Sequence, residues 1–201
     1  MVCFNVPAVL LLLVTGLARA GDVRITPEEF QLFFDWKDNK DDPRLVKDND
    51  ANKIRKIAQS LRVNATDLKK AIGRVEPAFP TLKADTEKLI REQLDKTPLK
   101  KAIRDVEVNI DTNHPVALVK WTCGDARDSD KEAAYVAWAV SQGGSIIKTA
   151  AVWCVNEADT KLFSAKIGRD QFQLVDVKSV DRFASSRYIK LFEDVKRGPH
   201  T

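Results

Sequence analysis

The sequence predicts an α+β protein: a helical N-terminal half followed by a β-β-α-β-β-α unit whose antiparallel sheet is covered by helices. Three observations lead to this prediction. Up to about residue 100 the apolar residues recur at helical spacing. From residue 103 they alternate with polar residues, as in a strand with one buried face. Capping residues also mark where several of the helices begin.

The first helix is expected to begin at Thr26. Thr26 and Glu29 have the spacing of a capping box, in which each side chain accepts a hydrogen bond from the other residue's backbone amide. Phe30, Phe33 and Phe34 follow at positions that share one helical face. This helix is therefore expected to dock an aromatic face on the rest of the protein.

Three further helices are predicted from apolar stripes. In chain order the stripes are Ile54, Ile57, Ala58 and Leu61; Leu68, Ala71, Ile72 and Val75; and Leu82, Leu89, Ile90 and Leu94. The second of these helices is capped by Asn64 and is expected to stop before Pro77, because proline lacks a backbone amide. The third is expected to span about residues 81–95.

The second half of the chain reads as strands around one helix. Strands are predicted over about 103–111, 117–123, 145–155 and 161–167, with a short further strand at Phe172 and Leu174. The Ala-rich run 128–142 ends at two glycines and is predicted as a buried helix, and a last amphipathic helix is predicted over about 180–197. No internal repeat is present.

The first twenty residues have the pattern of an export signal. The apolar run Ala8–Val14 is followed by Ala18 and Ala20 at the two positions that signal peptidase reads. The alternative, an uncleaved anchor, is disfavoured because a spanning helix needs about 20 apolar residues. The predicted organisation is a signal peptide at 1–20, a helical region at 21–100 and an α+β domain at 101–201. The mature protein is expected to be secreted or periplasmic and to have no stable membrane span.

Two cysteines remain once the signal is removed. In an oxidising compartment Cys123 and Cys154 are expected to form a disulfide, which stabilises the fold by about 3–4 kcal/mol in the chain-entropy model. Two buried free thiols are the alternative. No metal site is expected, because the only histidines are His114 and His200.

One segment of the predicted helical region is strongly basic. The whole chain has a net charge of only +4, so the clustering of charge matters more than the total. The candidate residues for binding a polyanion are Lys53, Arg55, Lys56, Arg62, Lys69, Lys70 and Arg74. The partners weighed for them are an anionic membrane, an envelope polymer, an acidic protein and nucleic acid.

The same segment carries a local motif. Apolar and small residues occupy the expected positions between residues 57 and 72, namely Ile57, Ala58, Leu61, Val63 and Leu68. This spacing resembles the helix-turn-helix signature of bacterial DNA-binding proteins, but Arg62 stands where that family usually has a turn glycine. The resemblance implies two helices crossing at a sharp angle and contact with DNA. An exported protein does not meet the chromosome, so nucleic acid is not the expected partner.

No catalytic motif is present in the sequence. It contains no Gly-x-Ser-x-Gly, no His-Glu-x-x-His and no phosphate-binding glycine loop, and no cofactor is expected. Residues 35–52 are Asp-rich but lack the spacing of an EF-hand calcium loop. A hydrolase built on Asp111, Asp125 and Asp128 is one alternative. The leading hypothesis is an exported, non-enzymatic binding or structural module.

Overall fold

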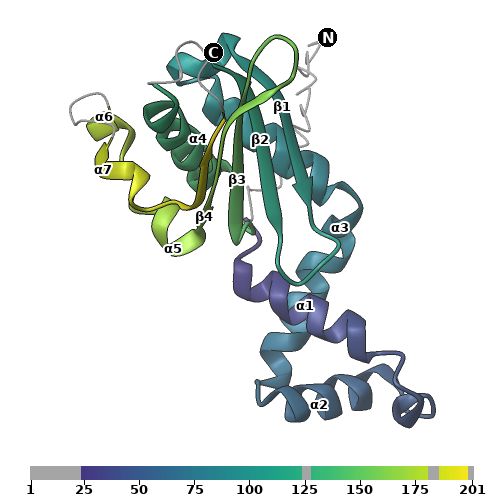
Figure 1. Ribbon diagram of the computed structural model, residues 1–201. Coiled ribbons are helices and arrows are strands. Elements are labelled where there is room, and N and C mark those ends of the chain that lie inside the picture. Colours follow the sequence, from purple (N-terminus) through teal and green to yellow (C-terminus); the bar gives the residue numbers. More distant parts are fainter. Residues whose placement is uncertain (1–23, 124–127, 181–185, 199–201) are drawn as a thin grey trace, which may run out of the picture.

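The computed structural model describes residues 24–123, 128–180 and 186–198. In chain order the helices are α1 (Pro27–Asn39), α2 (Asp50–Leu61), α3 (Ala65–Leu94), α4 (Ser129–Gly143), α5 (Arg169–Phe172), α6 (Val177–Val180) and α7 (Ser186–Ile189), with short 3-10 helices η1 (Pro43–Leu45) and η2 (Pro98–Lys101). The strands are β1 (Ile103–Asn109), β2 (Val116–Thr122), β3 (Thr149–Val155), β4 (Lys161–Gly168) and β5 (Glu193–Arg197). The α+β prediction is confirmed (Figure 1). The predicted signal peptide lies outside the described residues.

The five strands form one sheet in the order β1-β2-β3-β4-β5. Three of the pairings are antiparallel, as predicted, but β2 and β3 are parallel. The reason lies in the connection: α4 returns the chain to the end at which β2 began, so β3 runs in the same direction as β2. A strand–helix–strand order therefore introduces one parallel pair into an otherwise antiparallel sheet.

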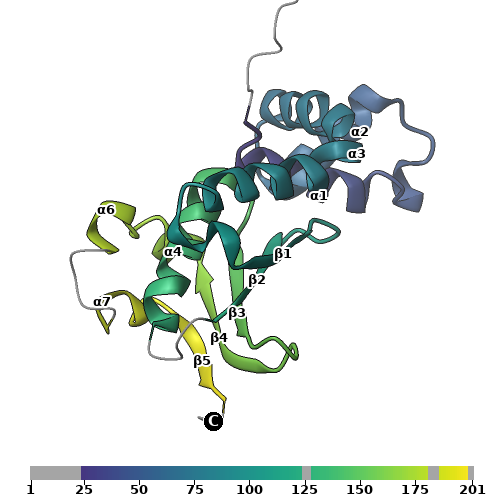
Figure 2. The same ribbon diagram turned by 90° about the horizontal axis from the view of Figure 1, so that it is seen from above.

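The main core lies between the sheet and the helices α3 and α4. Side chains from all four of the longer strands enter it, and the largest are Trp121, Phe163 and Ile167, each at most 2% exposed. In Figure 2, α3 and α4 lie on the same side of the sheet. None of the helices in the described residues is long and apolar enough to cross a membrane.

The start of α1 agrees with the sequence prediction. The Thr26 side chain accepts a hydrogen bond from the Glu29 amide, and the Glu29 side chain accepts one from the Thr26 amide, which completes the capping box. Phe30, Phe33 and Phe34 are buried. Their rings pack against one another and fix α1 to the N-terminal half of α3.

The predicted helix break before Pro77 is wrong, because α3 continues through both Pro77 and Pro80. A proline in a helix interior costs about 3 kcal/mol, so the surrounding packing has to offset that cost. Phe79, between the two prolines, lies 5.3 Å from the ring of Phe33, and the Lys37 ammonium lies 4.8 Å from the Phe79 ring. Docking of α1 thus holds this segment helical.

Arg62 joins α2 to α3 in the left-handed conformation, with φ 58° and ψ 38°. The Val63 amide donates to the carbonyl of Ala58 at 2.9 Å, a bond typical of this kind of helix end. Glycine adopts a positive φ without steric cost, whereas a residue with a Cβ does not. The arginine therefore stands at a position where the backbone favours glycine.

We expect Arg62→Gly to raise the free energy of unfolding by about 0.5–1 kcal/mol, because relief of the left-handed strain exceeds the extra entropy of glycine in the unfolded chain. Urea unfolding of the two proteins measures the difference. Arg62→Ala removes the same charge but keeps a Cβ, so it should leave stability unchanged. Equal stabilisation by both substitutions would assign the effect to charge instead.

The C-terminal segment departs most from the sequence predictions. Phe172 and Leu174 were predicted to share one face of a strand, but Phe172 is fully buried at the end of α5 while Leu174 is 65% exposed. The helix predicted over 180–197, which would end the β-β-α-β-β-α unit, is present among the described residues only as the short α7 and the last residue of α6. Its last residues form β5, which pairs with the edge of β4. A short, charged edge strand carries no apolar periodicity, so only this pairing identifies it.

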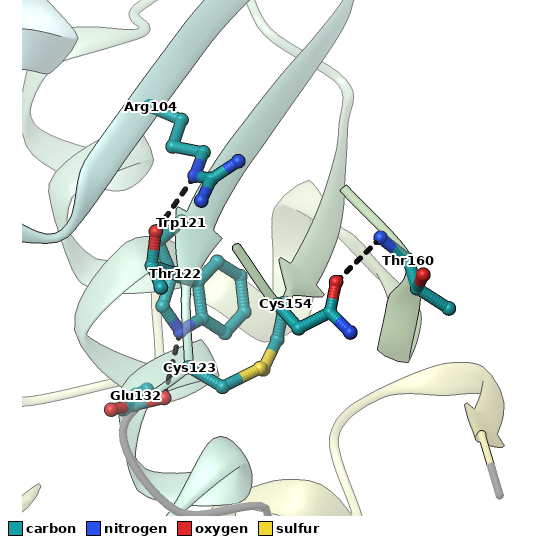
Figure 3. Close-up of a disulfide and its surroundings, with 8 residues drawn as sticks. Arg104, Trp121, Thr122, Cys123, Glu132, Cys154 and Thr160 are labelled. Atoms are coloured by element: carbon teal, nitrogen blue, oxygen red, sulfur yellow. Dashed lines mark hydrogen bonds between the residues drawn. A yellow bond between two sulfur atoms is a disulfide. The ribbon is translucent and has the colours of Figure 1, made fainter. Parts of the chain in front are cut away.

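Cys123 and Cys154 lie at disulfide distance, with Cα atoms 5.4 Å apart, as the sequence predicted (Figure 3). Cys123 follows the last residue of β2, and its amide donates to the carbonyl of Val155 in β3 at 3.0 Å. The pair therefore cross-links the two parallel strands at the end of the sheet beside the start of α4. A cysteine pair in this geometry is consistent with an oxidising compartment.

Candidate functional site

One face of the sheet is covered by helices and the other is open. Along β2 the buried residues Ala117, Val119 and Trp121 alternate with half-buried Leu118 and Lys120. The same alternation continues along β3 and β4, so that each strand turns every second side chain away from the core. Figures 1 and 2 show no described helix over this second face. The open face is therefore a regular surface available to a partner.

A row of paired residues crosses the open face, with one residue from each strand. In order from β1 to β5 the row is Asp105, Lys120, Trp153, Ser164 and Lys196. Neighbouring strands lie about 4.8 Å apart, so Lys120 and Lys196 are separated by about 14 Å along the row. An aromatic ring thus lies at the centre of the open face with a lysine on each side of it.

Two ammonium groups lie against the Trp153 ring. The Nζ atom of Lys161 is 3.6 Å from the ring centroid, and the Nζ atom of Lys120 is 5.3 Å from it. Cation–π contacts of this kind stabilise by about 0.5–1 kcal/mol at exposed sites. They also restrict the lysine rotamers before any ligand arrives, which lowers the entropy lost on binding.

We call the group Lys120, Trp153, Lys161, Ser164 and Lys196 the Trp153 patch. Among the described residues, none of its three lysines lies within ion-pair distance of an acid. A depression of about 190 Å³ runs along the β4–β5 side of the patch and is lined by Trp153, Lys161, Ser164 and Lys196, among others. The patch is therefore a positively charged surface with a shallow, aromatic floor.

Two of the acids near the patch are already paired. The Nζ atom of Lys166 donates to the Asp194 carboxylate at 3.0 Å, and this hydrogen bond holds the pKa of Asp194 below its usual range. Asp105, at the far end of the row, pairs with Arg91 of α3 at 3.2 Å. These pairs leave the centre of the open face with positive charge in excess.

The Trp153 patch was not found from the sequence. Lys120 and Trp153 lie 33 positions apart in the sequence, and only the parallel pairing of β2 with β3 brings them together. In the sequence, a tryptophan inside a long apolar run indicates a core residue. The alternation of side chains along β3 is the sequence feature that could have identified Trp153 as a surface residue, because it places Trp153 on the opposite face from Cys154.

The basic residues of the helical region are divided between paired and unpaired groups. Arg74 is bonded to Glu29 and to the carbonyl of Arg24, and Lys56 pairs with Asp48 at 2.7 Å. The other candidates have no ion pair within the described residues: Lys53, Arg55, Arg62, Lys69 and Lys70. Five of the seven basic residues predicted to bind a polyanion are thus unpaired within the described residues.

The acidic residues of the hydrolase hypothesis are not gathered in one place. Asp111 follows β1 and Asp128 precedes α4, so they lie at opposite ends of β2, about 20 Å apart for a strand of this length. Asp125 lies outside the described residues. Asp111 and Asp128 are both exposed. Two carboxylates this far apart cannot act on one bond.

Asp128 does line a cavity of about 630 Å³ beside the cysteine pair, together with Glu132 and Tyr135. Glu132, however, accepts a hydrogen bond at 2.7 Å from the indole nitrogen of Trp121 (Figure 3), which satisfies the buried indole. This carboxylate therefore has a structural role in fixing α4 to β2.

The Asp-rich segment 35–52 serves as caps and ion pairs. Asp42 caps η1 by accepting from the Arg44 amide, and the hydrogen bond from the Arg44 side chain lowers the pKa of Asp42 to about 2. Asn49 caps α2. Within the described ranges, no group of three or more acids, cysteines and histidines has the arrangement of a metal site.

Comparison of the chain with protein-family models, curated proteins and solved structures gave no match in any of the three.

Proposed function

We propose that the protein is an exported, non-enzymatic binding module that holds an anionic polysaccharide on the open face of its sheet. The observation that carries this proposal is the Trp153 ring with the ammonium groups of Lys120 and Lys161 against it. Export is supported by the N-terminal signal pattern and by the Cys123–Cys154 pair.

Charge favours an anionic ligand. Three lysines of the patch lack acidic partners among the described residues, and Asp194, which lines the depression, is held by Lys166. A carboxylate or sulfate that reaches Lys120 or Lys161 gains a charge-assisted hydrogen bond, roughly twice as strong as a neutral one. No uncompensated acid of the described residues opposes it at the centre of the face.

Shape favours a chain rather than an enclosed small molecule. The depression of about 190 Å³ is smaller than the 300–1,000 Å³ typical of small-molecule pockets. The row from Lys120 to Lys196 extends about 14 Å, enough for more than one sugar unit. The Trp153 ring holds the ammonium groups of Lys120 and Lys161 in place for charged contacts with such a chain.

Affinity chromatography of the mature protein tests the proposal. Heparin, polygalacturonate, neutral dextran and single-stranded DNA serve as immobilised probes at about 0.1 M and about 1 M salt, between which the Debye length falls from about 10 Å to 3 Å. We expect retention on the two anionic polysaccharides at the lower salt, release at the higher, and no retention on dextran. Stronger retention on DNA than on either polysaccharide would contradict the assigned ligand class.

Matched variants locate the surface. Lys120→Gln/Lys161→Gln should weaken polysaccharide binding about ten-fold or more, because two charged contacts are lost. Lys69→Gln/Lys70→Gln makes the same charge change in α3 and should leave affinity within about two-fold. Trp153→Phe should remove the ligand-induced change in tryptophan fluorescence. Loss of binding in the α3 variant alone would move the site to the helical region.

A further inference from the structure

Asn64 is the one residue of the sequence in an Asn-x-Ser/Thr sequon, followed by Ala65 and Thr66. It lies in the turn between α2 and α3 and is exposed. Its side-chain oxygen accepts a hydrogen bond from the Thr66 amide at 2.7 Å and so caps α3. Its amide nitrogen, Nδ2, has no hydrogen-bond partner among the described residues.

We propose that Asn64 is an N-linked glycosylation site of the exported chain, used when the host's secretory pathway supplies an oligosaccharide on a lipid diphosphate. The Nδ2 atom attacks the anomeric carbon of the sugar, and the new N–C bond replaces the C–O bond to the diphosphate. The lipid diphosphate leaves with the bonding electron pair, and Nδ2 loses one proton to base. No group is oxidised or reduced. The inference rests on the export part of the proposed function.

The cap and the modification are compatible at Asn64. The glycan is attached through Nδ2, whereas the cap of α3 uses the side-chain oxygen, which keeps its acceptor lone pairs in the glycosylated residue. Arg62, two residues before Asn64, has the left-handed conformation and turns the chain away from α2, so Asn64 lies at a corner, and Ala65 and Thr66 open the first turn of α3. Asn64 itself is exposed and lies outside both helices.

The position of Asn64 has a consequence for binding. Figure 1 shows the α2–α3 corner at the far end of α3 from the sheet, and α3 spans about 45 Å over its 30 residues. A glycan there covers the neighbourhood of Arg62 and Lys69 and leaves the open face of the sheet uncovered. Glycosylation thus shields the helix-turn-helix-like segment from large polyanions while the Trp153 patch stays accessible.

The test uses the full chain expressed in eukaryotic secretory cells. We expect the secreted protein to lose apparent mass on treatment with peptide N-glycosidase, and the peptide containing residue 64 to gain an aspartate there. Asn64→Asp keeps an oxygen that caps α3, and Thr66→Ala keeps the amide that the cap uses, so both should fold normally and show no mass shift. A secreted wild-type chain with an unmodified Asn64 would overturn the inference.

The same samples separate this inference from the proposed function. Polysaccharide retention through the Trp153 patch should be equal, within about two-fold, for the glycosylated chain and for Asn64→Asp. An unmodified Asn64 with retained polysaccharide binding overturns the glycosylation site alone. A glycosylated chain that binds none of the anionic polysaccharides overturns the ligand assignment alone.

Discussion

Gly143→Ala is expected to lower the free energy of unfolding by about 3 kcal/mol. Gly143 ends α4 where this helix crosses α3, and a Cβ there would lie 2.6 Å from the Ile90 amide nitrogen and 2.7 Å from the Leu89 carbonyl. Those neighbours are backbone atoms of a long helix, so no side-chain rotation relieves the clash. The two helices must separate, and the well-packed core beneath them loses contact.

Gly73→Ala is the matched control. Gly73 lies in α3, and a Cβ at this position meets no atom within 4 Å. Alanine is better than glycine in a helix interior by about 0.5–1 kcal/mol, so this variant should be more stable than the wild type. Urea unfolding monitored by circular dichroism compares the three proteins. If the two variants shifted stability equally, the close approach of α3 and α4 at Gly143 would be refuted.

Cys123→Ala/Cys154→Ala should cost about 3–4 kcal/mol, the loop-closure entropy that a cross-link over 31 residues removes from the unfolded chain. That is a large part of the 5–15 kcal/mol by which domains are typically stable. Alanine avoids placing a hydroxyl at Cys154, which is fully buried. The measurement is the urea midpoint of the variant against the oxidised wild type.

The reductant dependence provides the control for the cross-link. Wild-type protein unfolded in reductant should approach the stability of the double variant, whose own midpoint should not respond to reductant. Alkylation of the native protein without reductant should label neither Cys123 nor Cys154. Free labelling of both thiols in protein from its native host would contradict the disulfide and remove one support for export.

The two candidate binding surfaces, the basic helical segment and the Trp153 patch, differ in how far the sequence could predict them. The basic segment between Lys53 and Arg74 is visible as a local run of charge, yet two of its members, Lys56 and Arg74, are paired within the fold. The Trp153 patch has no local signal, because its residues come from β2, β3, β4 and β5. Strand register, a property of the folded sheet, is what collects them.

The sequence by itself determined the elements whose signals are local. The capping box at Thr26, the alternation in β1 and β2 and the glycines that end α4 each depend on residues a few positions apart, and the structure has each of them. Side-chain caps and periodicity act within one or two turns or along one strand, so they can be recognised without the fold.

Only the tertiary structure decided the rest. The continuation of α3 through Pro77 depends on the rings of α1, and the conversion of the last segment into β5 depends on the free edge of β4. The parallel pairing of β2 with β3, which places Lys120 beside Trp153, follows from where α4 packs. In each case contacts between distant parts of the chain outweigh the local preference. Going against that preference costs about 1–3 kcal/mol, and the free energy gained from the summed burial of apolar surface is larger.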